Sequence, residues 1–399
     1  MFRLLQVDAS TAQRLTQDLE QQLGQQQADL LIATGNVASM ATLAELPQAR
    51  HFSRHWIACS SCIGAASSLG VDQASDRRLS ILAIHDATGS YGVASVEQDP
   101  SQICQQAAAT VLAAIANAGR QAELPALIWC MQAPGFEEQV IDGIQQVVGD
   151  QVPILGGSAA DDDVSGGWNQ FDGDRLGHQL LVIAVLYPTV PISSYFSSGY
   201  SPAHFSGTIT AVQGRRILTI DQQPALQVYN HWLQQTGIPP MQPGVVMSES
   251  TFYPIGRELN AKDIPFSLLS LPTSVAADGS IELLAELQQG DQIALMQGSR
   301  QQLVRRAAHV VRVAGNNLRL QHHVEPAAAL IVYCAGCMLA IREQIAEVQQ
   351  SLSDTLPGIP YLVAFTFGEQ GCFADGFNRH GNLMISSVLF GKTTREPAA

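Results

Sequence analysis

Short apolar runs alternate with helical segments along most of this chain, and the same order of elements recurs three times. This recurrence constrains the fold more than any other feature, because a strand with its helix buries an apolar face only against neighbouring elements. The copies share the order of their elements and not their residues, so the repeat is one of topology. It predicts an α/β fold of two domains, built from recurring strand-helix-strand-strand-strand units with mixed sheets.

The segments that carry the recurrence have helical or strand periodicity. The first copy has helical stretches over 10–25 and 38–49 and strands over 28–36, 55–64, 78–86 and 91–99. The second has helices over 101–118 and 137–149 and strands over 126–132, 152–162 and 177–187. The third has a helix over 339–352 and strands over 329–337, 359–371 and 381–391.

The segment between the second and third copies sets the predicted division of the chain. Residues 194–220 alternate like strands, and the chain turns helical from Pro224, with Asp221 as the expected cap. Because 399 residues exceed the usual size of a single core, two domains are expected. We predict a helical lead-in, an N-terminal half, connecting strands with a helix, and a C-terminal half, over residues 1–27, 28–200, 201–237 and 238–393.

Charge and composition exclude several classes of partner. The formal net charge is −14, the only lysines are Lys262 and Lys392, and the arginines are scattered apart from short adjacent pairs such as Arg305 and Arg306. Nucleic acid and anionic membrane surfaces both require clustered basic contacts, so neither is expected as a partner. The first residues lack a secretory signal, and no apolar run reaches the ~18 residues of a spanning helix. A cytoplasmic protein is therefore expected.

Two turns at the ends of predicted strands are candidate ligand sites, because open α/β sheets bind ligands at strand carboxyl ends. One comprises Gly156, Gly157, Ser158, Asp161 and Asp162, and the other Gly368, Glu369 and His380. We expect both to border one cavity. The alternatives are a turn in which the aspartates hold backbone amides, and a glutamate that is purely structural. A hydrolase is not expected, because Ala160 stands where a nucleophile elbow needs glycine.

The cysteines form two C-x-x-C pairs, Cys59 with Cys62 and Cys334 with Cys337, among seven in all. The remaining three are Cys104, Cys130 and Cys372. An odd number spread over a long chain is typical of reduced thiols, so no disulfide is expected within either pair. A zinc site or a redox role stays open, although cysteines in apolar strands are more often packing residues.

Histidines next to aromatic residues are the candidate haem ligands. His231 lies beside Trp232 and His204 beside Phe205, and a non-covalent haem needs one histidine that faces an apolar pocket. We expect His231 in preference to His204, with an ordinary exposed histidine as the alternative. Nearby aromatic residues that could form the pocket walls are Tyr195, Phe196, Tyr200, Phe205, Tyr229 and Trp232. Phosphate-binding glycine motifs are absent, so nucleotide cofactors are not expected.

Several blocks, in this order, resemble the two consecutive halves of the FIST domain. They are the turn GGSAADD (156–162), the strand and helix from Gly214 to Trp232, YCAGC (333–337), and PYLVAFTFGEQG (360–371) followed by HGNLMISS. The resemblance implies a sensory module that binds a small ligand and is not an enzyme. A free-standing form of this length resembles the bacterial nitric-oxide sensors, which bind haem b and regulate a separate histidine kinase.

Two kinds of ligand stay open at this point. Haem b with nitric oxide is the first, and an amino acid or similar metabolite, bound through Asp161, Asp162 and Glu369, is the second. The resemblance implies a sensor histidine kinase or a cyclic-di-guanylate enzyme as partner. The sequence does not identify the direction of regulation, and a homo-oligomer stays open.

Overall fold

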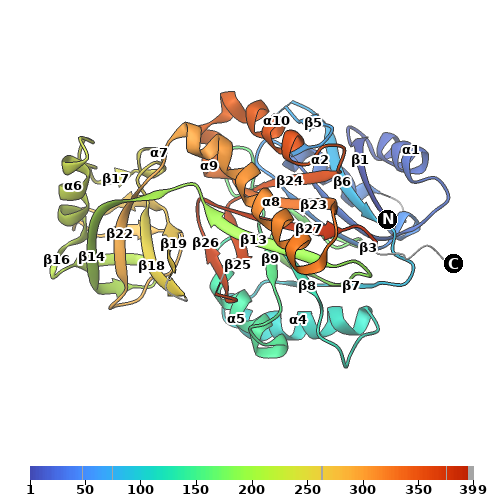
Figure 1. Cartoon of the computed structure of the whole chain (residues 1–399), viewed down its shortest axis with the longest axis horizontal. Coiled ribbons are helices and arrows are strands. Elements are labelled where there is room, and N and C mark those ends of the chain that lie inside the picture. Colours follow the sequence, from blue (N-terminus) through green and yellow to red (C-terminus); the bar gives the residue numbers. More distant parts are fainter. Residues whose placement is uncertain (47, 74, 262–263, 374, 394–399) are drawn as a thin grey trace.

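The computed structural model describes residues 1–393 apart from residues 47, 74, 262–263 and 374. Three mixed sheets form a body, and a smaller domain of strands projects from one end of it (Figure 1). This smaller part, residues 199–299, is called the insert domain below. The predicted class, α/β with two domains of recurring units and mixed sheets, is confirmed.

The body contains three units that follow one order of elements: an outer strand, a helix, a central strand, a second helical segment, a parallel strand, a short hairpin and a final strand. The first unit comprises β1 (Phe2–Asp8), α1 (Ala12–Leu23), β2 (Ala28–Gly35), α2 (Val37–Ala41), a 3-10 turn (Thr42–Glu45), α3 (Ala49–Phe52), β3 (Ser53–Ser60), β4 (Ala65–Ser67), β5 (Gly70–Val71) and β6 (Arg78–Ile84). The second comprises β7 (Ser90–Glu97), α4 (Ile103–Asn117), β8 (Leu127–Gln132), α5 (Glu137–Val148), β9 (Ile154–Ser158), β10 (Gln170–Phe171), β11 (Leu176–Gly177) and β12 (Leu180–Tyr187).

The third unit is interrupted by the insert domain after its first strand. It comprises β13 (Ile192–Ser198), α8 (Arg300–His322), β23 (Pro326–Cys334), α9 (Ala335–Ala340), a 3-10 turn (Arg342–Gln344), α10 (Ile345–Thr355), β24 (Tyr361–Thr366), β25 (Gly368–Cys372), β26 (Asn378–Gly381) and β27 (Met384–Gly391). β13 pairs with β27 along its whole length, although more than 180 residues separate them. The insert domain is therefore an excursion from a unit whose two parts are held together by this pairing.

Each unit gives its hairpin to the sheet of another unit. The hairpin β4–β5 pairs with β24, β10–β11 pairs with β3, and β25–β26 pairs with β9. Each sheet consequently has four strands of its own unit and two from another, in the same spatial order. The exchange is cyclic, so all three units depend on one another.

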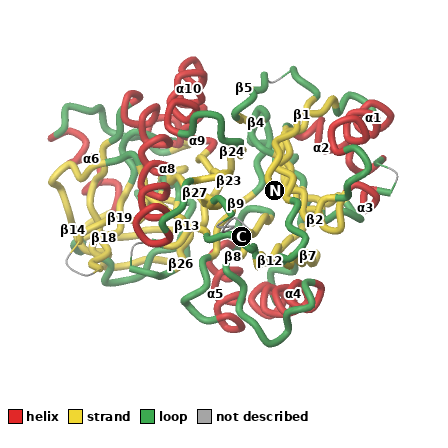
Figure 2. Tube along the Cα trace, turned by 45° about the vertical axis from the view of Figure 1, so that its right-hand side comes forward, coloured by secondary structure: helices red, strands yellow, loops and turns green. Residues whose placement is uncertain are grey.

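The three sheets turn their inner faces toward a common core and their outer faces toward helices. Large side chains of the common core come from all three sheets, among them Ile57, Trp129 and Leu330. Helices α1 to α3 cover the first sheet, α4 and α5 the second, and α8 and α10 the third (Figure 2). The strands are buried on both faces, which is why they read as nearly continuous apolar runs.

The insert domain is a strongly curved set of strands with its own apolar core. It comprises β14 (Ser201–Gln213), β15 (Arg216–Ile220), β16 (Gln223–Pro224), α6 (Ala225–Gln235), β17 (Gly244–Val245), α7 (Met247–Ser250), β18 (Ile255–Ala261), β19 (Ile264–Ser270), β20 (Pro272–Val275), β21 (Ile281–Leu283) and β22 (Gln292–Gln297). The residue at the N-cap position of α6 is Pro224, which makes no capping hydrogen bond with its side chain. The expected cap, Asp221, instead accepts a hydrogen bond from the Thr208 amide at 2.9 Å. No helix in the described part of the chain is long and apolar enough to span a membrane.

Two features differ from the sequence expectation. Strand β1, which pairs with β6, precedes the helix expected over 10–25, and the polar turn after residue 162 carries the short strands β10 and β11. Both involve short or half-polar segments, whose strand character is fixed by their partners. The domain limits given above stay predictions.

Candidate functional site

The two strand-end motifs that the sequence singles out lie side by side, because β25 pairs antiparallel with β9. Gly368 is opposite Ser158, and Glu369 is opposite Gly157. A Cβ atom on Gly157 would stand 2.6 Å from the Gly368 carbonyl oxygen, and one on Gly156 would stand 1.9 Å from the Cys130 carbonyl oxygen. These glycines therefore permit close approach of strand to strand within the protein.

Asp161 and Asp162 hold backbone amides. The Asp161 carboxylate accepts hydrogen bonds from the amides of Val164, Gly166 and Gly167 at 2.5 to 2.7 Å. Asp162 accepts from the Ile63 amide at 2.7 Å, and partial burial raises its pKa above the ordinary value. This arrangement matches the alternative in which the aspartates order a turn.

Glu369 is fully buried beside the third sheet. Its carboxyl group accepts from the Thr366 hydroxyl at 3.1 Å and from the Met384 amide at 3.0 Å. Burial, followed by the nearby Cys334 thiol, raises its pKa well above the usual range. Burial thus favours the neutral acid over the carboxylate, and no ligand reaches the group from solvent in this conformation.

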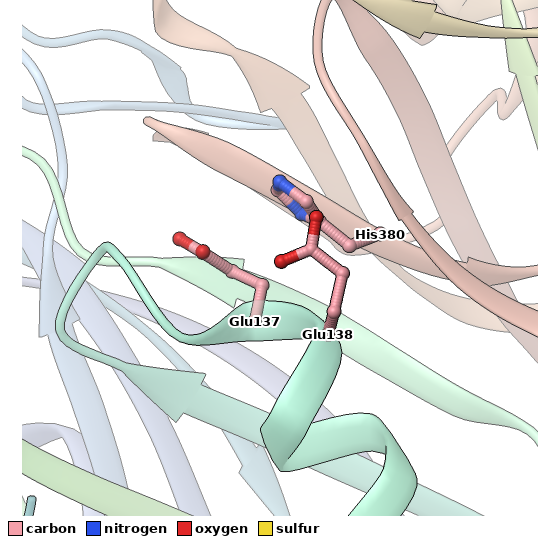
Figure 3. Close-up of side chains that lie close together, drawn as sticks. All are labelled: Glu137, Glu138 and His380. Atoms are coloured by element: carbon pink, nitrogen blue, oxygen red, sulfur yellow. The ribbon is translucent and has the colours of Figure 1, made fainter. Parts of the chain in front are cut away.

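His380 belongs to a buried polar cluster that the sequence did not reveal. Its ligand atoms and those of Glu137 and Glu138 lie within 4.8 Å of one another (Figure 3). Glu137 also accepts from the Ser158 hydroxyl at 2.6 Å and from Arg215 at 2.9 Å. Burial alone would raise the pKa of Glu137, but the His380 and Arg215 charges and the serine bond outweigh it and hold that pKa at about 2.

The two candidate haem histidines lie on the surface of the insert domain. His231 is exposed on α6, and His204 is exposed on β14 with a positive φ of 66°. Neither lines the two cavities described below. Of the six aromatic residues expected around a porphyrin, Tyr229 and Trp232 belong to the core of the insert domain and Phe205 packs against it.

The four cysteines of the two C-x-x-C pairs do not all lie in one place. Cys59 faces the common core, with its sulfur 3.2 Å from that of Met131, whereas Cys62 lies in the core with Cys334 and Cys337. Burial raises the pKa of Cys59 and of Cys62 to about 12. A protonated thiol is a poor metal ligand and a poor nucleophile, so this environment favours packing. The expected absence of a disulfide stays a prediction.

A cavity of 830 Å³ opens between the insert domain and the body. Its apolar wall is aromatic: Phe373 stacks on Phe266 with ring centroids 5.2 Å apart, and Phe196 meets the edge of Phe373 at 4.9 Å. Other apolar groups of the wall are Tyr195, Tyr200, Met296 and Met384. The volume falls within the range of roughly 300 to 1,000 Å³ that is usual for sites of small ligands and cofactors.

The opposite wall of this cavity is basic and comes from α8. Arg305, Arg306 and His309 line it. Arg306 donates to the Ser197 hydroxyl, yet its buried Nε has no hydrogen-bond partner among the described residues. Partial burial, and then the charges of Arg306 and Arg312, lower the pKa of His309 below its ordinary value. His309 is therefore a neutral imidazole at neutral pH, free to accept a hydrogen bond or to bind iron.

The sequence contained part of the signal for this cavity. Tyr195, Phe196 and Tyr200 are residues expected around a porphyrin, and Arg305 with Arg306 is an adjacent arginine pair that the sequence singles out. His309 was missed because a histidine in a long helix carries no local mark of a site. A smaller cavity of 430 Å³ lies between α8 and α10, where Arg312 and Arg319 contribute.

Comparisons with known proteins agree with the sequence resemblance. The FIST N domain matches residues 29–223, and the FIST C domain matches residues 225–372. No curated protein matches.

Two solved structures are similar only at a distance. Cyanuric acid hydrolase from A. caulinodans has 7% identity and a TM-score of 0.37, with 98% of this chain and 99% of that chain covered. PurLQS from Thermotoga maritima has 10% identity and a TM-score of 0.23, with 76% and 72% covered. TM-scores below 0.5 do not establish a shared fold.

Proposed function

The chain belongs to the FIST family, and from that membership we propose that it is a cytoplasmic sensor whose ligand binds in the 830 Å³ cavity between the insert domain and the body. FIST domains are signal-transduction sensor domains that bind small ligands, and they are sensory and not catalytic. The observation that carries the proposal is the meeting of an aromatic wall with a basic wall in one cavity.

The chemistry of the two walls favours a flat apolar ligand with acidic groups. The rings of Phe196, Phe266 and Phe373 offer stacking surface, while Arg305 and Arg306 offer charge-assisted hydrogen bonds to carboxylates. The Nε of Arg306, which has no partner in the described part of the chain, is a donor that such a carboxylate would satisfy. Haem b, an apolar macrocycle with two propionates, has this combination of features.

In the haem version of the proposal, His309 would bind the iron, and Arg305 and Arg306 would hold the propionates. When bound, the haem iron supplies the binding site for nitric oxide. The cavity lies between two domains, so a change in what it holds alters the contacts of one domain with the other. A partner histidine kinase, or a cyclic-di-guanylate enzyme, would respond to that change.

One observation also favours the metabolite version. The Arg306 Nε, for which the described residues offer no partner, is as suited to the carboxylate of an amino acid as to a propionate. In this version, the aromatic wall binds the side chain of the metabolite and no haem is present.

The absorption spectrum of the purified protein, reconstituted with haem b, tests the haem version. Wild type is expected to give a Soret band that shifts on addition of nitric oxide, and His309→Ala is expected to lose or shift that band. His231→Ala and His204→Ala are the matched controls, because both replace exposed histidines outside the cavity. A band that depends on His231 or His204 and not on His309 would place the haem elsewhere.

A protein without any haem spectrum would leave the metabolite version to be tested. Isothermal titration with amino acids is then expected to show binding that Arg306→Ala weakens. If Arg306→Ala leaves both haem and amino-acid affinity unchanged, the cavity is not the ligand site.

A further inference from the structure

A second buried polar site lies where three parts of the chain meet: the amino end of α5, the hairpin β25–β26 and the insert domain. Its side chains are Glu137 and Glu138 from α5, His380 from β26, and Arg215 from the turn before β15. Glu137 and His380 are almost completely buried, at 2% and 3% exposure. The site contributes nothing to the cavity between the domains and stands apart from the proposed function.

The two glutamates are held so that one oxygen of each faces the same point. The Oε1 atom of Glu137 accepts from the Ser158 hydroxyl at 2.6 Å and the Gly135 amide at 3.0 Å, while the Oε1 atom of Glu138 accepts from the Glu286 amide at 2.9 Å. Both Oε2 atoms bind a single nitrogen of Arg215, Nη2, at 2.9 and 2.6 Å. That nitrogen occupies the place that a cation would take between two oriented carboxylates.

His380 supplies the observation that distinguishes this site from an ordinary ion pair. Its Nε2 lies 3.4 Å from the carbonyl oxygen of Leu284 and 3.5 Å from the Nδ2 atom of Asn382, whereas its buried Nδ1 has no partner among the described residues. The ring folds over Gly368, where a Cβ would stand 2.6 Å from the His380 ring. A neutral His380 with its proton on Nε2, toward that carbonyl, would leave Nδ1 bare, which is the arrangement of a metal ligand.

Unpartnered polar atoms also surround the site. Gln370 is paired directly with His380, and Gln132 with Ser158, so their side chains share the sheet face that α5 covers. Both side-chain atoms of each glutamine are buried without a partner in the described part of the chain. Such clustering of unsatisfied groups is typical of a place that holds an ion or ordered water.

We propose that Glu137, Glu138 and His380 bind a divalent transition-metal ion of the zinc type, which displaces the Arg215 guanidinium. Imidazole nitrogen and carboxylate oxygen are both zinc ligands in proteins, and open zinc sites combine three protein ligands with a water. Zinc bonds of about 2.0 to 2.1 Å separate tetrahedral ligand atoms by roughly 3.3 Å, so atoms within 4.8 Å must draw together by at most about 1.5 Å. Magnesium is disfavoured because it demands oxygen ligands in octahedral geometry.

Displacement of Arg215 would loosen the insert domain from the body. Arg215 follows Gly214 in a turn and its side chain is 19% exposed, so the guanidinium can swing outward into solvent. Other contacts near this point include the Glu286 amide on Glu138, the Gln139 amide nitrogen on Glu286, and the hydrogen bonds of Asn382 with the backbone of Leu269 and Leu271. Metal binding is thus a second input that acts on the same pair of domains as the cavity.

Zinc titration of the full chain by calorimetry tests the proposal. We expect wild type to bind one zinc ion, and Arg215→Gln to bind it about tenfold more tightly or better, because the competing guanidinium is gone. Arg216→Gln is the matched control: Arg216 is the next residue, but it pairs with Asp278 at an exposed position. An Arg215→Gln variant that binds zinc no more tightly than Arg216→Gln would overturn the proposal.

A second variant keeps the test decisive if Arg215→Gln does not fold. His380→Gln retains the pairs of Arg215 with both glutamates, and it is expected to weaken zinc binding about tenfold or more, since one of three protein ligands is lost. His231→Gln, which removes an exposed histidine, is expected to bind as wild type does. Equal zinc affinity of His380→Gln and wild type would show that the metal binds elsewhere.

Hydrogen exchange tests the effect on the domains. Saturating zinc is expected to speed exchange of the backbone amides over residues 213–216 in wild type, and to leave it unchanged in His380→Gln. Unchanged exchange in zinc-bound wild type would exclude displacement of Arg215.

Discussion

The carboxyl group of Glu369 shows how one buried acid links folding to pH. It has no exposed surface, and burial together with Cys334 raises its pKa well above 4.5. The folded state therefore keeps this proton over a pH range in which the unfolded chain has already lost it. Because stability falls with rising pH wherever the folded state binds more protons, Glu369 destabilises the protein increasingly above pH 4.5.

Glu369→Gln should remove this dependence, because an amide resembles the protonated acid and does not titrate. The free energy of unfolding of the variant, minus that of wild type, is expected to rise from pH 5 to pH 8. The rise is at most about 1.4 kcal/mol for each pH unit over which Glu369 is protonated in the folded protein but not in the unfolded chain. Urea denaturation at each pH measures the difference. Glu282→Gln, at an exposed position, is the control and should follow wild type.

A difference between Glu369→Gln and wild type that stays constant from pH 5 to pH 8 would contradict this account. It would mean that the folded protein ionises Glu369 as readily as the unfolded chain does.

The candidate site residues illustrate what single positions in a sequence do and do not disclose. GGSAADD and FGEQG are recognisable as strand ends, and they do lie together, since β9 and β25 pair. The cluster around His380 could not be predicted from the sequence. Its members are far apart in the chain: Arg215 and Glu137, for example, are separated by 78 residues and belong to different domains. Contacts that depend on how domains meet leave no local pattern.

At the scale of elements, helix α8 differs from the rest of an acidic chain. Its 23 residues include five arginines and two histidines but no aspartate or glutamate. It lines the cavity between the domains with one part and the smaller cavity with another. The position of this helix therefore determines where the protein presents positive charge to a ligand.

The start of α8 is fixed by Ser299, whose hydroxyl accepts a hydrogen bond from the Gln302 amide at 3.3 Å. Ser299→Ala is expected to lower the free energy of unfolding by about 1 kcal/mol, since an amide at the helix start loses its partner. Urea denaturation measures it. Gln344→Ala, at the start of α10, is the control, because Gln344 makes no capping bond with its side chain.

If Gln344→Ala destabilises the protein as much as Ser299→Ala does, the capping bond is not the cause.

Which elements the sequence predicts follows from how far each depends on distant partners. Strands such as β8, β12 and β23 are long apolar runs, so their periodicity identifies them without further information. β10 and β11 have two residues each, and they are strands only because β3, more than 100 residues earlier, pairs with β10. The helix expected over 339–352 is α9, a 3-10 turn and α10, which short-range periodicity does not separate.

For the whole molecule, the cyclic exchange of hairpins predicts that no unit is stable alone. A cut between Val190 and Pro191 separates the first two units from the third. Fragments 1–190 and 191–393 are each expected to lack cooperative unfolding, because β24 then loses β4 and β9 loses β25. Mixed in equal amounts, they should recover it, as near-ultraviolet circular dichroism during urea denaturation would show.

Cooperative unfolding of fragment 1–190 by itself would contradict the prediction, since the sheet of the second unit would then be stable without β25–β26.

The same exchange has a consequence for how the protein is made. The sheet of the second unit is completed by β25, and the sheet of the third by β27, which ends at Gly391. A ribosome adds about 5 to 20 residues per second. Because several hundred residues lie between β3 and β27, β27 emerges on the order of tens of seconds after β3. Throughout that interval, the inner apolar faces of the first two sheets lack the third sheet that completes their common core. Synthesis of this chain is therefore expected to depend on chaperones that shield nascent strands until the last of them is released.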